Sequence, residues 1–114
     1  MPKAHVIKNF GGPEVLEWGE VEVADPGPGE VRLRQRAVGM NMMEVGLRMG
    51  VYPGPPLPFI PGVEAAAEVI ALGDGVSDFK VGDRVGYAGP PVGSYAEERN
   101  FPESRLFSLP DDVT

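Results

Sequence analysis

Short apolar segments alternate with breaks rich in glycine and proline along the whole chain. Within EVRLRQRAV, three arginines alternate with valine, leucine, glutamine and alanine, which is the period of two typical of a strand with one face in water. The recurrence of such segments predicts a mostly β fold, a barrel or sandwich. We expect the arginines to form its wet face rather than an anion site. The predicted strands are AHVIKNF, VLEWGEVEV, EVRLRQRAV, VEAAAEVIALG, DRVGYAG, SYAEERNF and RLFSLP.

One segment predicts a helix instead, over about Met42 to Met49. Asn41 can cap its start, and Glu44 follows three positions later in a variant of the capping box. Gly50 suits the left-handed residue that ends a helix. Gly46 lies inside the segment and costs about 1 kcal/mol relative to alanine, so we expect a neighbouring element to pack closely there.

The next segment, YPGPPLPFIPG, holds five prolines in eleven residues. Because proline fixes φ and removes a backbone donor, this segment can be neither a helix nor a central strand. One interpretation is a linker or a proline-rich ligand for an adaptor domain. Leu57, Phe59 and Ile60 favour the other, a stiff loop pinned onto the core.

Composition and charge limit the classes of partner. The chain has 114 residues, enough for one compact domain, and a formal net charge of −7, which leaves no basic surface for phosphates or anionic lipids. No apolar run approaches the roughly 20 residues that span a bilayer, and the start of the chain lacks the apolar core of a signal peptide. We therefore expect a cytoplasmic protein with no nucleic-acid or membrane partner.

The chain has no cysteine and a single histidine, His5. This composition excludes disulfides and thiol chemistry. Zinc usually needs at least two histidines, or a histidine and a cysteine, so no zinc site is expected. The sequence also has no clustered Asp/Asn/Gly loop typical of calcium sites. No metal ligand is predicted.

Six short motifs follow one another along the chain: GGPEVLE, AVGMN, GVYP, LPFIPGVE, FKVGDRV and GSYAE. In this order and spacing they resemble the zeta-crystallin-like quinone oxidoreductases, a zinc-free branch of the medium-chain dehydrogenase/reductase superfamily. The resemblance covers nearly the whole chain. It implies a GroES-like β-barrel with a short helix, with residues 1–114 as the catalytic (substrate) domain.

Differences from zinc-dependent alcohol dehydrogenases agree with this branch. Where those enzymes place a cysteine ligand, this sequence has Asn41, and where they place a histidine ligand, it has Val63. Between Val85 and Ser94, where they insert a four-cysteine lobe, only GYAGPPVG remains. The resemblance therefore implies catalysis without zinc.

The resemblance also implies the chemistry and the rest of the subunit. Family members transfer hydride from NADPH to a quinone or enone, form homodimers at full length, and carry a Rossmann domain after the equivalent of Thr114. This chain has no GxGxxG or GGxG fingerprint after a strand, and its last residues, LPDDVT, are types that start a helix. We expect a part of a longer subunit that binds NADPH weakly by itself.

Asn41 and Tyr52 are the predicted catalytic residues. A quinone or enone gathers negative charge on oxygen when it accepts hydride, so a site without a metal needs hydrogen-bond donors aimed at that oxygen. An asparagine amide and a tyrosine hydroxyl both supply such donors. The structural alternatives are that Asn41 only caps the helix and that Tyr52 only packs under the proline-rich loop.

Met42, Met43 and Arg48 are the predicted cofactor contacts, because family members contact the cofactor at the first two positions. Their structural alternatives are core packing for the methionines and a favourable interaction with the helix dipole for the arginine. Many quinone oxidoreductases resemble NFxDxYxRxGxYP here, whereas this chain has Gly46 in place of that first tyrosine. Loss of the tyrosine would widen the pocket beside the nicotinamide.

Two other functions stay open at this point. A zinc-free enoyl-thioester reductase needs the same hydride geometry as a quinone reductase. A stand-alone β-barrel that binds or assembles without catalysis would have the same fold, because fold alone does not confer activity.

Overall fold

The computed structural model of the chain describes residues 2–39, 42–50, 55–89 and 91–109. Strand and helix positions confirm the predicted mostly β fold with one short helix. The strands are β1 (Lys3–Ile7), β2 (Leu16–Glu20), β3 (Glu30–Val38), β4 (Glu64–Leu72), β5 (Arg84–Ala88), β6 (Glu98–Pro102) and β7 (Phe107–Ser108). The helices are α1 (Met42–Met49) and two 3-10 turns, η1 (Pro13–Val15) and η2 (Glu103–Arg105).

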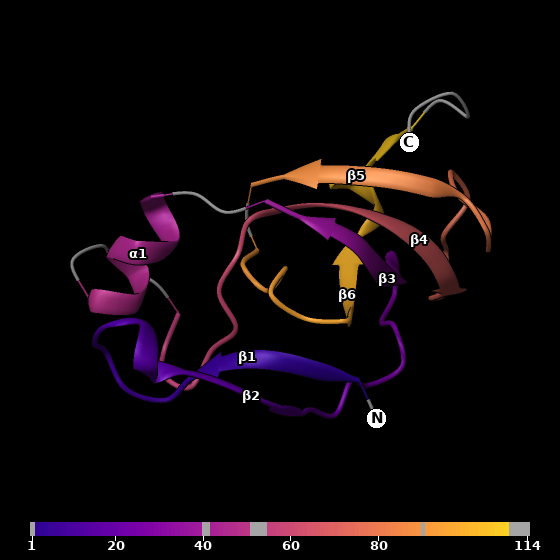
Figure 1. Ribbon diagram of the computed structural model, residues 1–114. Coiled ribbons are helices and arrows are strands. Elements are labelled where there is room, and N and C mark those ends of the chain that lie inside the picture. The colour runs from indigo at the N-terminus through magenta and orange to yellow at the C-terminus, as the bar shows by residue number, and fades with distance from the viewer. Residues whose placement is uncertain (1, 40–41, 51–54, 90, 110–114) are drawn as a thin grey trace.

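Two antiparallel sheets lie opposite one another, with α1 at one end (Figure 1). β1 and β2 form the smaller sheet, and the larger has the order β6-β3-β4-β5-β7. The curved β3, β4 and β5 arch over the β1–β2 pair, and the chain passes beside the end of β1 before it enters β4 (Figure 1). Within the described ranges, no helix is long and apolar enough to cross a membrane.

The main core lies on the inner face of the larger sheet. In β3, Val31 and Leu33 are fully buried while the arginines between and after them are exposed or half-buried, which matches the predicted alternation. Tyr87 and Phe101 stack in this core with ring centroids 4.2 Å apart. The buried cluster consists of Val31, Leu33, Ala67, Val69, Val85, Tyr87 and Phe101.

The β3 arginines form a wet face, as predicted, and two of them pair with carboxylates on neighbouring strands. Arg32 lies 2.8 Å from Glu98, and Arg36 lies 2.6 Å from Glu68. Such pairs at half-exposed positions add little stability, about 0–1 kcal/mol each. They neutralise the arginines across the strands and leave less positive charge for an anion.

The last long strand is shorter than the sequence pattern predicts. SYAEERNF predicts a strand from Ser94 onward, but β6 begins at Glu98. The preceding residues bond to the other sheet instead, with the Tyr95 carbonyl accepting from His5 N at 2.9 Å and Glu97 N donating to the Lys3 carbonyl at 2.8 Å. Pairing to β1 therefore joins the two sheets at this point.

The proline-rich segment is pinned to the core through one of the three predicted side chains. Phe59 is buried, and its backbone exchanges hydrogen bonds with Ile7 at 2.8 and 3.0 Å. Ile60 is half-buried, and Leu57 is exposed, contrary to the expectation. The backbone bridge to β1 fixes this loop, and Pro61 beyond it is fully buried.

Candidate functional site

The predicted site residues lie within or close to Met42–Met49 in the sequence, the residues of α1, and the structure describes part of them. Asn41 and Tyr52 lie outside the described residues. Met42 and Met43 begin the first turn of α1, and for these two residues only the backbone is described. Arg48 is described fully: its Nε donates to the Gly11 carbonyl at 3.1 Å. The roles of all five in binding or catalysis remain predictions.

Arg48 fastens the end of α1 to the segment that follows β1. Besides the side-chain bond, the Gly11 N–H donates to the Arg48 carbonyl at 2.9 Å. At the next turn Gly50 has φ of +80°, the left-handed conformation expected of a residue that ends a helix. A guanidinium held by a backbone carbonyl in this way has a structural task, which leaves only its terminal nitrogens for a ligand.

The inner face of α1 packs onto the smaller sheet and the proline-rich loop. Leu47 is 4% exposed and forms a cluster with Ile7 and Phe59. Gly46 is buried, as its position in the helix predicted, and Glu44 is also buried at 4% exposed. A buried carboxylate in the first helical turn is stabilised by the positive end of the helix dipole.

Tyr95 is a neighbour of this helix that the sequence pattern did not single out. Burial raises the pKa of the Tyr95 hydroxyl, the Glu44 carboxylate raises this pKa further, and Arg48 lowers it. The hydroxyl therefore stays protonated and able to donate at neutral pH. In the sequence, Tyr95 belongs to the GSYAE motif, but the motif does not show that Tyr95 lies near α1.

An apolar groove of about 430 Å³ lies beside Tyr95. The His5 ring stands between two aromatic rings, with centroid distances of 4.8 Å to Trp18 and 6.5 Å to Tyr95. Val38, the last residue of β3, also lines the groove, and the chain continues from it toward Asn41. We call this the aromatic groove; its apolar and aromatic walls are His5, Leu16, Trp18, Ala37, Val38, Tyr95 and Ala96, and Gln35, Arg36 and Glu97 also line it.

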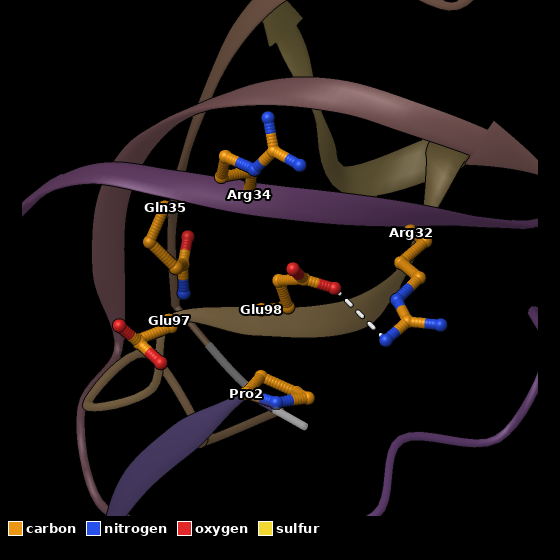
Figure 2. A pocket seen from close by; sticks show the side chains of 6 residues that line it. All are labelled: Pro2, Arg32, Arg34, Gln35, Glu97 and Glu98. Carbon is orange, nitrogen blue, oxygen red and sulfur yellow. Dashed lines mark ion pairs between the residues drawn. The ribbon is translucent and has the colours of Figure 1, made fainter.

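A second cleft, of about 520 Å³, lies between β3, β6 and the start of the chain (Figure 2). Arg32 and Glu98 form an ion pair inside it, while the Arg34 guanidinium points away from the carboxylates (Figure 2). Glu97 accepts a hydrogen bond from Lys3 N at 2.7 Å. Arg48, the predicted site residue whose side chain the structure describes, does not line this cleft, and two of the cleft's four charged side chains are paired with each other. We do not assign it as the functional site.

Among the described residues, no group of three or more histidine, aspartate or glutamate side chains is placed to hold a metal ion. Val63, at the position of a histidine ligand in zinc-dependent relatives, is buried and 8% exposed. A valine supplies no ligand atom at this position.

This β fold and its helix define a GroES-like domain. Residues 27–111 match the family "Alcohol dehydrogenase GroES-like domain", and the chain belongs to that family. At the level of sequence and structure, the relatives it resembles include quinone oxidoreductases. The resemblance seen in the six motifs is thereby confirmed.

Two curated relatives match almost the whole chain. A quinone oxidoreductase of Pseudomonas aeruginosa is 50% identical over 113 residues, which cover 99% of this chain and 35% of the relative. A 2-haloacrylate reductase of a Burkholderia species is 45% identical over 99% of this chain and 35% of the relative. The chain thus spans about a third of the length of these relatives.

Solved structures match at the level of the whole fold. A quinone oxidoreductase of Pseudomonas syringae has a TM-score of 0.96 and 45% identity, covering 100% of this chain and 35% of that one. The Escherichia coli quinone oxidoreductase complexed with NADPH has a TM-score of 0.94 and 37% identity, covering 98% of this chain and 34% of that one.

Proposed function

We propose that residues 1–114 are the substrate domain of an NADPH-dependent reductase that delivers hydride to a quinone or enone without zinc. The observation that carries this proposal is the match to a quinone oxidoreductase at 50% identity over 99% of the chain. In the proposed complete enzyme, a Rossmann domain holds most of the cofactor. The family resemblance further implies a cytoplasmic homodimer.

The described residues suit one end of NADPH better than the other. The chain carries a net charge of −7, and Glu44 lies in the first turn of α1, so the phosphates would meet repulsion here. The uncharged nicotinamide suits a surface with mainly apolar walls such as the aromatic groove beside Tyr95. When bound, the cofactor supplies the hydride. Met42, Met43 and Arg48 are the residues proposed to contact it.

In the proposed reaction this chain contributes hydrogen-bond donors and the walls of the substrate pocket. Asn41 and Tyr52 donate hydrogen bonds to the acceptor oxygen as negative charge develops on it. Arg48 holds α1 to Gly11 and so orients the first turn of the helix, which follows Asn41. Apolar walls exclude water, which strengthens these hydrogen bonds.

A chimeric enzyme tests the proposal. Residues 1–114 are joined to the part of the P. aeruginosa quinone oxidoreductase that follows its matching segment. We expect the chimera to oxidise NADPH in the presence of a quinone, measured as loss of absorbance at the nicotinamide band. The isolated chain is the control, and we expect calorimetry to detect little or no NADPH binding to it.

The choice of acceptor separates the alternatives. A panel of a quinone, an enone, a 2-haloacrylate and an enoyl thioester is offered to the same chimera. The 2-haloacrylate belongs in the panel because a 45% identical relative is named for that substrate. Turnover fastest with the enoyl thioester would replace our proposal by that activity. A folded chimera that binds NADPH and reduces none of them would favour a binding module.

Zinc content gives an independent test. With no cysteine and one histidine, we expect metal analysis of the purified chain to find far less than one zinc per chain. The measurement is elemental analysis after dialysis against buffer without chelator. Zinc bound at one per chain, removable only by a chelator and with loss of activity in the chimera, would contradict the zinc-free mechanism.

A further inference from the structure

Arg99, in β6, is a buried cation at 9% exposed. We infer that it is a positioning residue: through the loop of residues 91–95 it fixes the backbone of Pro61 and Gly62, which leads into β4. The conformational part of this inference stands without the proposed function. Its consequence for catalysis rests on that function.

The Arg99 guanidinium holds the loop by its carbonyl groups. Nη2 donates to the carbonyls of Pro91 at 3.0 Å and Val92 at 3.1 Å. Nη1 donates to the Tyr87 hydroxyl at 3.3 Å, and Nε to the Asn100 carbonyl at 3.3 Å. These bonds require a planar guanidinium, because its nitrogens donate in several directions at once: to the loop, to the Tyr87 hydroxyl and to the backbone of β6.

The charge of Arg99 is held without a carboxylate. Among the described residues no ion pair includes Arg99. Its guanidinium carbon lies 4.8 Å from the ring centre of Phe101 and 5.3 Å from that of Tyr87, positions typical of cation–π contact. A lysine would keep the charge but would lose the planar contact with the rings and the separate nitrogens that bond to the loop, to Tyr87 and to Asn100 at the same time.

The same loop donates its amides to two consecutive carbonyls at the entry of β4. These amide bonds are Gly93 N to Gly62 O at 2.8 Å, Ser94 N to Gly62 O at 3.3 Å, and Tyr95 N to Pro61 O at 3.0 Å. The loop is therefore held through its carbonyls by Arg99 and through its amides by Pro61 and Gly62.

The loop also lies very close to the Arg99 guanidinium at Gly93. Gly93 has φ of +140°, a conformation that favours glycine, and a Cβ there would lie 3.1 Å from the Arg99 guanidinium carbon. Any residue with a side chain at this position would push against the cation. Glycine therefore allows the close approach on which the two carbonyl bonds depend.

A series of backbone connections continues from Pro61–Val63 toward the predicted site. Glu64 begins β4 directly after Val63, and its carbonyl accepts a hydrogen bond from Gly39 N at 3.1 Å. Gly39 stands two positions before Asn41. A backbone path thus joins the buried cation to the segment that carries the proposed donor.

Amide hydrogen exchange of the labelled 114-residue chain, followed residue by residue by NMR, tests the inference. In Arg99→Lys we expect the Gly93 and Tyr95 amides to exchange about tenfold or more faster, because opening of the loop becomes easier. Val69 N, which bonds to the Asp83 carbonyl at 2.9 Å in the core, reports global stability and should change much less. We also expect the Gly39 amide signal to shift.

Arg32→Lys is the matched control, because Arg32 lies on the adjacent strand and pairs with Glu98 rather than with a loop. It should leave the loop amides unchanged. Arg99→Ala provides a second variant, in which millimolar guanidinium ion should restore slow exchange of Gly93 and Tyr95, while sodium chloride should not.

Equal acceleration of Val69 and the loop amides in Arg99→Lys, or no change in either, would overturn the positioning role. The catalytic consequence is read in the chimera, where Arg99→Lys should lower kcat about tenfold with KM for NADPH nearly unchanged. A wild-type chimera without activity would refute the proposed function, while the exchange result would still decide the role of Arg99.

Discussion

Replacing Gly62 by alanine is expected to lower the free energy of unfolding by about 3 kcal/mol, a large part of the 5–15 kcal/mol that holds a small domain together. Gly62 has φ of +104°, where a side chain costs about 1–2 kcal/mol. An added Cβ would overlap the Ser94 hydroxyl and come within 2.6 Å of Tyr95 Cδ1. Overpacking of this kind costs about 1–3 kcal/mol more.

Urea unfolding followed by circular dichroism measures this effect. Gly82→Ala is the matched control, because Gly82 has a similar φ of +97° but no atom within 4 Å of an added Cβ among the described residues. It should cost about 1 kcal/mol, from the backbone alone. Equal losses in the two variants would mean that the contact of Gly62 with Ser94 and Tyr95 is not tight.

Changing Asn41 to aspartate is expected to lower turnover about a hundredfold in the active chimera while thermal stability is retained. The aspartate keeps an oxygen that can cap the helix, and its charge suits a helix start. It removes the amide donor and places negative charge near the oxygen where charge develops. If Asn41 only caps the helix, turnover should therefore stay nearly unchanged, whereas turnover should fall if Asn41 is a catalytic donor.

The measurement compares kcat and the melting temperature of Asn41→Asp with those of the parent chimera. Tyr52→Phe accompanies it, since it removes only a hydroxyl and should lower turnover without unfolding the barrel. If both variants keep full turnover with several quinones and enones, Asn41 and Tyr52 are not the donors, although the family assignment would still hold.

Local patterns in the sequence were sufficient for the strands and the helix. The alternation in β3 and the helix end at Gly50 are decided by side chains and backbone preferences within a few residues. The start of β6 was not predictable in this way. Whether Tyr95 bonds to β3 or to β1 depends on a pairing across about 90 residues, for which SYAEERNF carries no local signal.

The site was predictable in part for the same reason. The motifs placed Asn41, Tyr52 and Arg48 in one region of the chain, and the structure shows Arg48 bound to Gly11. No local pattern indicates that Glu44 influences the pKa of Tyr95, or that Arg99 bonds to the carbonyl of Pro91, eight positions away. These contacts form only when separate segments of the chain come together, so the hydrophobic and polar pattern of any one segment does not predict them.

Trp18, whose ring is tilted by 49° against that of His5 at the wall of the aromatic groove, is the only tryptophan in the chain. Trp18 is half exposed, at 51%, so its fluorescence depends on what lies in the groove as well as on the neighbouring imidazole. All indole emission from this protein therefore originates at one place. A ligand or a docking domain that covers the groove would change that emission directly, without any label being attached.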